Sequence, residues 1–183
     1  MNDREDILYI LVITNVEKGV FICESDTFKV AIVRAPMIYG ADSPGNFQRL
    51  MQLSKMVPVL PQIENQRSAL YIKHLTTFIT DLITLESAGV FHPQDDFYFE
   101  TTAVMREIRR QYELKTLEIW IPKRLNRYLN QIKLFKKLFG HLTYANDLYH
   151  DHQIQERVSG EMAEVMKEIV EVTKKNQSKV IKG

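Results

Sequence analysis

The chain has 183 residues, 45% of them hydrophobic and 26% charged, and its formal net charge is +1 at pH 7. These values are ordinary for a globular protein and exclude the disordered, collagen-like and coiled-coil classes, while the small net charge argues against nucleic-acid binding through overall charge. At this length we expect one domain with a sizeable core.

Residues 1–27 form an atypical N-terminal segment that contains the only cysteine, Cys23. A lone thiol cannot form an intramolecular disulfide and is typical of a reducing compartment, so the sequence predicts a cytoplasmic protein. The apolar run at 7–13 is too short to span a bilayer and follows acidic residues. We therefore expect neither a signal peptide nor a membrane helix.

A strand, a loop and a helix are predicted in order from residue 28. Residues 28–33, FKVAIV, are short, apolar and partly β-branched, which is typical of a buried strand in a parallel sheet. Ser43 and Pro44 suit the N-cap and the first position of a helix. The apolar face of that helix would consist of Phe47, Leu50 and Met51.

Helices and strands are also expected to alternate in the middle of the chain. Two prolines mark a loop at 57–62, and 67–72 is predicted to be a strand. Apolar side chains at helical spacing then predict a helix with Leu75, Phe78, Ile79, Leu82 and Ile83. Three further elements are predicted: a strand at 96–101, a helix at 101–112 and a strand at 116–120.

The last third of the chain begins with a basic segment and ends with an amphipathic helix. Pro122 opens a predicted helix, and the stretch 119–146 contains no acidic residue. This stretch is either a solvated basic face, which we favour, or an anion-binding wall. The last helix carries Met162, Val165, Met166, Ile169 and Val170 on one face. Residues 175–183 are expected to form a frayed tail.

Two runs of sequence contain a distinctive order of motifs: FKVAIVRAPMIYGADSPGNFQRLMQL at 28–53 has an Arg-x-Pro-x-x-Tyr-Gly element followed by Gly-Asn-Phe, and RSALYIKHLTTFITDLI at 67–83 begins with an arginine before a predicted strand. Together they resemble the NAD-dependent epimerase/dehydratase family, the extended short-chain dehydrogenases that act on nucleotide sugars. The likeness is greatest to UDP-glucose 4-epimerase and its relatives in polysaccharide biosynthesis, and it extends to about Tyr144. It implies an α/β chain with the C-terminal part of a Rossmann-like fold. Residues 28–174 would combine a partial parallel sheet with a small nucleotide-sugar-binding lobe.

The resemblance associates NAD, the cofactor of the family, with the Arg-x-Pro-x-x-Tyr-Gly turn. By position it implicates Ala35, Pro36 and Met37 in cofactor binding. Proline suits this role because it holds the chain extended, so that backbone groups can lie against the flat nicotinamide ring. The alternative is that Pro36 simply ends a strand.

The resemblance also implies a binding site for a UDP-sugar. Asn46 and Phe47 match positions that meet the phosphate and the base at the start of a helix, where free N–H groups and the helix dipole favour an anion. Arg67 matches an arginine that contacts the pyrophosphate, and its guanidinium suits two phosphate oxygens. Lys136 or Lys137 would supply a second, looser contact. On residue chemistry alone, Asn46 could equally cap its own helix while Phe47 fills the core.

The catalytic motifs of the family are absent from this sequence. None of the eight tyrosines is followed four residues later by lysine, so the Tyr-x-x-x-Lys pair that takes a proton from the sugar is missing. The seven glycines form no G-x-G-x-x-G turn for a dinucleotide. The resemblance departs at Lys73 and His74, because many relatives carry an acid just before the helix that starts at Leu75. We expect His74 to be a local cap or a surface residue rather than a catalytic residue. We therefore expect a truncated member of the family that does not turn over substrate or bind NAD by itself.

Two functional hypotheses follow. In the first, the chain is a substrate lobe that binds a UDP-sugar without turnover. In the second it is a non-catalytic interaction module, whose exposed sheet edge is covered by a second copy or by a complementing N-terminal half. Nucleic-acid binding is less favoured because no aromatic platform accompanies the basic segment. A metal site is also less favoured than exposed surface for the polar group Asp147, His150, Asp151 and His152.

Overall fold

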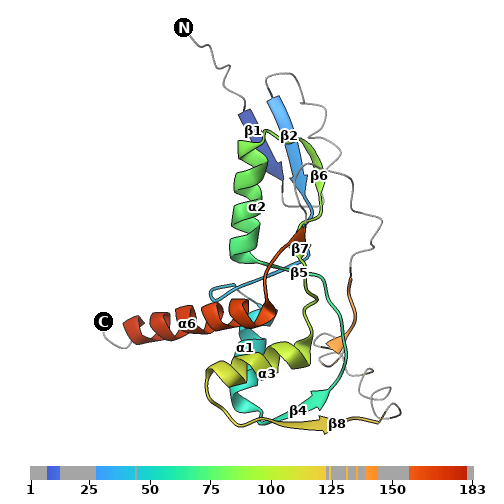
Figure 1. Cartoon of the computed structure of the whole chain (residues 1–183), viewed down its shortest axis with the longest axis vertical. Helices are drawn as coiled ribbons and strands as arrows, with labels where there is room; N and C mark the ends of the chain where they lie inside the picture. The colour runs from blue at the N-terminus through green and yellow to red at the C-terminus, as the bar shows by residue number, and fades with distance from the viewer. Residues whose placement is uncertain are drawn as a thin grey trace.

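The structure is a computed structural model that describes residues 8–12, 28–43, 45–122, 139–143 and 157–180, together with residues 124, 131 and 135. This part of the chain is an α/β fold in which the named strands pair in parallel. Two hydrophobic cores organise it. One lies between a three-stranded sheet and a helix, and the other lies among three helices (Figure 1).

The first core lies between α2 (Ile72–Thr84) and a sheet with the strand order β1-β2-β6 (Figure 1). The three strands are β1 (Leu8–Val12), β2 (Phe28–Val33) and β6 (Gly89–Phe91). The core consists of seven buried side chains, Ala31, Val33, Leu70, Leu75, Phe78, Leu82 and Phe91. Val30 and Ile32, which alternate with Ala31 and Val33 along β2, are fully buried as well. Burial of both faces is typical of a strand in a parallel sheet and explains the continuous apolar run in the sequence.

The second core contains α1 (Asn46–Met56), α3 (Thr101–Gln111), α6 (Met162–Val180) and the parallel pair of β3 (Met37–Tyr39) and β5 (Ala69–Tyr71). α3 packs against both α1 and α6. Three aromatic side chains lie at its centre, where the ring of Tyr39 is 5.4 Å from that of Phe47 and 5.3 Å from that of Phe99 between centroids. This core therefore joins segments that are far apart in the sequence.

Two further strand pairs complete the described fold: β4 (Val59–Gln62) with β8 (Leu117–Trp120), and β7 (Gln94–Asp95) with β9 (Arg157–Val158). In Figure 1 the β4–β8 pair lies at the opposite end of the molecule from the β1–β2–β6 sheet. The apolar side chains of Leu117, Ile119 and Trp120 on β8 are exposed. This end of the molecule thus presents apolar surface to solvent.

Most of the predicted elements are confirmed. The strand at 28–33 has the predicted bounds, and the helices expected after residues 43, 72 and 101 are present as α1, α2 and α3. Strands also lie within the segments 67–72 and 116–120. The predicted apolar face of the last helix is buried at Val165, Met166, Ile169 and Val170. These elements share a clear apolar periodicity, which is the strongest signal of secondary structure in a sequence.

Three local predictions are wrong. Ser43 does not cap α1, because the helix begins at Asn46 after Gly45, and Gly45 has a φ of 98° and no side-chain cap is formed. The segment 57–62, expected to be a loop, contains β4. The strand expected at 96–101 is absent: the short strand precedes it at β7, and Phe99 is instead a core residue.

The C-terminal prediction also needs correction. α6 continues to Val180, so residues 175–180 are helical and not a frayed tail. Asn176, near the end of α6, donates a hydrogen bond from its Nδ2 to Asp42 Oδ1 at 3.2 Å, which connects the end of α6 to the loop before α1. Most of the helix predicted from Pro122 lies outside the described residues. Within the described ranges, no helix is long and apolar enough to cross a membrane.

Candidate functional site

Several residues predicted to bind substrate or cofactor lie around one small cavity between the starts of α1 and α3. Its lining consists of Met37, Asn46, Phe47, Leu50, Arg67, Phe99 and Thr101. Its volume is about 20 Å³, enough for roughly one water molecule, and the cavity is open to solvent. Asn46, Phe47 and Arg67, which the sequence assigned to the substrate, are therefore neighbours in space. Met37, which it assigned to the cofactor, lines the same cavity.

The start of α1 gives this cavity a positive electrostatic character. Gly45 adopts a φ of 98°, a conformation that glycine reaches without the steric cost of a side chain, and the helix begins at the next residue. The first turn of α1 contains no acidic residue, and its N-cap residue, Gly45, has no side chain with which to cap the helix. The first N–H groups of the helix, which have no acceptor within the helix itself, and the positive end of the helix dipole therefore lie at the cavity, next to the exposed Asn46.

The start of α3 is held beside the cavity by Asn65, a fully buried residue that sequence reasoning missed. Asn65 Oδ1 accepts a hydrogen bond from the backbone N–H of Thr101 at 2.9 Å, and its Nδ2 donates to Thr101 Oγ1 at 3.1 Å. These two bonds satisfy groups at the first turn of α3. Because Asn65 and Thr101 are 36 residues apart, no local pattern could have indicated the pairing.

The backbone around Arg67 is fixed on two sides. Its carbonyl oxygen accepts from Phe99 N–H at 2.9 Å, and Arg67 forms a parallel bridge with Leu142. Partial burial lowers the pKa of the Arg67 guanidinium, which nevertheless stays charged at neutral pH. A cation with reduced access to water attracts an anion more strongly than a fully solvated one. Arg67 thus places a positive charge at the cavity, on a backbone that is fixed by hydrogen bonds.

The other predicted site residues do not join this group in the described structure. Ala35 packs against the core under α2, and Pro36 is half-buried between β2 and β3 and does not line the cavity. A role of Ala35, Pro36 and Met37 in cofactor binding therefore stays a prediction. Lys136 and Lys137 lie outside the described residues, as do the histidines and aspartates at 147–152. Among the described residues, no three His, Cys, Asp or Glu side chains gather in an arrangement suited to a metal ion.

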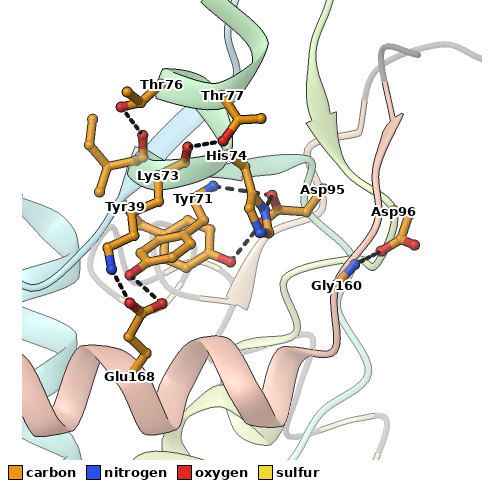
Figure 2. Close-up of polar contacts among 11 residues, drawn as sticks. Tyr39, Tyr71, Lys73, His74, Thr76, Thr77, Asp95, Asp96, Gly160 and Glu168 are labelled. Atoms are coloured by element: carbon orange, nitrogen blue, oxygen red, sulfur yellow. Dashed lines mark hydrogen bonds and ion pairs between the residues drawn. The ribbon is translucent and has the colours of Figure 1, made fainter. Parts of the chain in front are cut away.

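A second polar group lies beneath the start of α2 and is centred on Asp95 (Figure 2). The Asp95 carboxylate accepts from Tyr39 Oη–H at 2.6 Å and from the backbone N–H of Tyr71 at 3.2 Å, and its Oδ1 lies 2.8 Å from His74 Nδ1. The Asp95 side chain is fully buried. Burial raises the pKa of Asp95, and the three hydrogen bonds oppose that rise only in part.

This network is unsuited to phenolate chemistry. Burial, followed by the neighbouring Asp95 charge, raises the pKa of Tyr39 well above its ordinary value. Burial and the Glu168 carboxylate raise the pKa of Tyr71 in the same way. Proton abstraction by tyrosine at neutral pH requires a lowered pKa. Both hydroxyls therefore act as hydrogen-bond donors within the fold.

His74 is neither a helix cap nor a surface residue, contrary to expectation. Its ring is half-buried, bonds Asp95 and packs edge-on against Tyr71, with ring centroids 5.3 Å apart. Asp95 lies 21 residues further along the chain, so nothing adjacent to His74 in the sequence indicates this partner. The role of His74 in this structure is to connect the start of α2 with β7.

The fold is similar to those of several solved epimerases and reductases. A dTDP-4-dehydrorhamnose reductase from Clostridium acetobutylicum has a TM-score of 0.56 at 16% identity, over 79% of this chain and 49% of that chain. A UDP-N-acetylglucosamine 4-epimerase from Bacillus cereus has a TM-score of 0.53 at 14% identity, over 80% of this chain and 47% of that chain. A human epimerase family protein with NADPH has a TM-score of 0.52 at 12% identity, over 81% of this chain and 50% of that chain.

The chain therefore shares part of the Rossmann-like α/β fold of these epimerases and reductases. It spans about half the length of the chains it matches. No protein-family model matches the sequence, and no curated protein matches it either. A shared fold does not by itself specify an activity, so the function has to be argued from the cavity and its residues.

Proposed function

We propose that this chain binds a nucleoside-diphosphate sugar at the cavity between α1 and α3, with Arg67 as the principal contact to the pyrophosphate. The supporting observation is that Asn46, Phe47 and Arg67, which the family resemblance assigns to the substrate, line the same cavity although Arg67 is about twenty residues from the other two in the sequence. A partly buried guanidinium beside an uncapped helix start is chemically suited to an anion. A UDP-sugar is the ligand class that we favour.

The size of the cavity limits how such a ligand would bind. A volume of about 20 Å³ admits one water molecule and not a diphosphate. The pyrophosphate would therefore lie at the mouth of the cavity, between exposed Asn46 and half-buried Arg67. The base and the sugar would extend over the surrounding surface, or Phe47 would move to admit part of the ligand.

The proposal is limited to binding. Of the residues predicted to bind the cofactor, Ala35 packs against the core under α2 and only Met37 lines the cavity, and we derive no step through NAD. Tyr39 and Tyr71 have raised pKa values, which oppose their use as bases. UDP-glucose epimerisation by this chain alone is therefore not part of the proposal. A cytoplasmic location, favoured by the single thiol, remains part of it.

Calorimetric titration of the purified chain with UDP-glucose tests the proposal. We expect the wild-type chain to bind and the Arg67→Glu variant to bind at least about 30-fold more weakly, because a like charge would face the pyrophosphate. The control is Arg110→Glu, which reverses an exposed charge at the far end of α3 and should bind as the wild type does. Absence of binding by the wild-type chain, or equal binding by Arg67→Glu, would refute the proposal.

A second candidate is self-association, favoured by the exposed apolar side chains of β8. Leu117 is 62% exposed, Ile119 45% and Trp120 71%. Among the described residues β8 pairs only with β4, so its other edge offers backbone donors and acceptors to another strand. The two candidates can be separated, because Arg67→Glu should not alter the oligomeric state.

A further inference from the structure

A larger concave groove lies away from the Arg67 cavity, between α6 on one side and the loop after β3 with the start of α2 on the other. Its volume is about 590 Å³, within the range of roughly 300 to 1,000 Å³ that is typical of small-molecule sites. The lining residues are Ile38, Ala41, Asp42, Ser43, Tyr71, Ile72, Lys73 and Val172. Most of this surface is apolar, and the charged groups are few.

The wall formed by α6 carries a regular row of side chains. Glu168, Val172 and Asn176 are spaced four residues apart, so they lie on one face of the helix. The rise of an α-helix places Glu168 and Asn176 about 12 Å apart along the axis. Val172 lies between them and lines the groove. The row therefore consists of an apolar centre with a polar residue at each end.

Both ends of this row make contacts across the groove. Glu168 forms an ion pair with Lys73 and accepts from Tyr71 Oη–H at 3.1 Å, as Figure 2 shows. At the other end, Asn176 donates to Asp42 at 3.2 Å. The groove thus has a basic end at Lys73 and an acidic end at Asp42, with apolar surface between them.

The groove and the Arg67 cavity lie on opposite sides of β3. Met37 lines the cavity and Ile38, its neighbour in the strand, lines the groove. Successive side chains of a strand point to opposite faces, so a ligand in one site does not contact the other. Gly40 keeps the groove wall close to α2, since a Cβ at this position would lie 2.7 Å from Ile72 Cγ2.

The Glu168 carboxylate indicates which ligand group the basic end would hold. It is bound by an ammonium group and a phenolic hydroxyl, which together form a small carboxylate site. The first turn of α2, next to this point, contains no acidic residue that would repel an anion. Both partners are open to solvent, with side-chain exposures of 61% for Lys73 and 39% for Glu168, so an exchange of carboxylates is sterically feasible.

We propose that this groove binds a small organic acid with an aliphatic body, whose carboxylate replaces that of Glu168 at Lys73 and Tyr71. The aliphatic part lies along Val172 and Ile72. Asp42 at the far end repels a second negative charge, so the site favours a monocarboxylate over a dicarboxylate. Glu168 acts as a competitor built into the chain, and its removal strengthens ligand binding.

The test uses hexanoate as the probe, with binding to the full chain followed by NMR of the methyl groups of Ile72 and Val172. Hexanoate is expected to shift both signals in the wild-type chain. The Glu168→Gln variant should bind about two- to fivefold more tightly, because it loses an exposed ion pair of the strength usual for surface pairs. The Lys73→Met variant should show no saturable shift. Glu171→Gln is the matched control, since it removes an exposed carboxylate from α6 outside the groove and should behave as the wild type.

Two other probes and one further variant complete the test. Hexylammonium, with the same aliphatic body and the opposite charge, should not bind more tightly to Glu168→Gln. Inorganic phosphate should bind more weakly than hexanoate because it lacks the apolar part. Equal binding of hexylammonium and hexanoate, or hexanoate binding that survives in Lys73→Met, would overturn the proposal. If Glu168→Gln fails to fold, Val172→Trp replaces it: this variant fills the groove and must abolish the hexanoate shift at Ile72.

Failure of this proposal can be told apart from failure of the nucleotide-sugar proposal. The Arg67→Glu variant should retain the hexanoate response because Arg67 does not line the groove. Loss of that response in Arg67→Glu would mean that the two sites are not independent.

Discussion

Asp95 illustrates how one buried side chain can connect several elements. Its carboxylate joins Tyr39 on β3 with Tyr71 and His74 at the start of α2, while Asp95 itself belongs to β7. A buried carboxylate is costly unless its oxygens accept hydrogen bonds, and each oxygen here has at least one donor or ring nitrogen within reach. Loss of one partner would leave a buried donor or acceptor without a hydrogen bond, which lowers the stability of the fold.

The pKa of Asp95 leads to a prediction about stability and pH. Burial raises the pKa of this carboxyl above 3.8, so the folded chain holds the proton more tightly than the unfolded chain does. Stability from this proton is fully present below pH 3.8 and is lost as the pH rises through the raised pKa. Compared with Asp95→Asn, the wild-type chain should therefore lose free energy of unfolding as the pH rises over that window. Denaturant unfolding at a series of pH values measures the difference, and parallel curves for the two proteins would contradict it.

At the scale of elements, Arg109 joins two helices and a strand. Its Nη1 donates to the carbonyl of Ser54 near the end of α1 at 2.7 Å, and its Nε donates to Thr116 Oγ1, just before β8, at 2.9 Å. Its Nη2 donates to the carbonyl of Lys115. Arg109 is only 3% exposed. A single guanidinium thus satisfies three acceptors where α1, α3 and the approach to β8 meet.

We predict that Arg109→Lys destabilises the chain by about 2–4 kcal/mol, because an ammonium group on a flexible stem cannot replace the planar fork and leaves buried acceptors without donors. The free energy of unfolding measured by urea denaturation tests this prediction. Arg110→Lys is the control: this neighbour is exposed and pairs with Glu107, so its substitution should leave the midpoint almost unchanged. Equal midpoints for the two variants would show that the Arg109 contacts contribute little.

At the scale of the whole molecule, the residues of the two cores alternate along the sequence, and the apolar surface of β8 lies at the end farthest from the β1–β2–β6 sheet (Figure 1). Trp120 is the only tryptophan and is 71% exposed. Its fluorescence therefore reports on this end of the molecule alone. An exposed apolar strand edge is a site at which copies of a chain associate.

If the chain self-associates through β8, the Trp120 emission should shift to shorter wavelength as the protein concentration rises, since the indole would leave water. The Ile119→Lys variant places a charge on the same strand and should abolish both the shift and any dimer seen by sedimentation velocity. Thr84→Lys is the control, because it places the same charge on the exposed surface of α2, away from β8. A concentration-independent emission in a wild-type dimer would place the interface elsewhere.

The helices and the central strand could be predicted because their apolar periodicity is local. Val30 and Ile32, or Leu75 and Phe78, are recognisable without knowledge of any partner. The errors fall where the local signal is ambiguous. Phe97 and Phe99 suggest a strand by composition, yet Phe99 is buried between α1 and β3 by contacts that only the fold provides. The prolines at 57–62 predict a loop, but this segment contains β4, since a short strand at the edge of a sheet can include proline.

Sequence alone determined the α/β class, the strand at 28–33 and the helical segments α1, α2, α3 and α6. It also selected Asn46, Phe47 and Arg67 as candidate ligand-binding residues. Each depends on local periodicity or on a motif. The tertiary structure alone decided that these three residues share one cavity, that His74 bonds Asp95, and that Glu168 meets Lys73 across a groove. The reason is physical: such contacts join residues separated by tens of positions, and their formation depends on how buried faces pack rather than on any property of the neighbouring sequence.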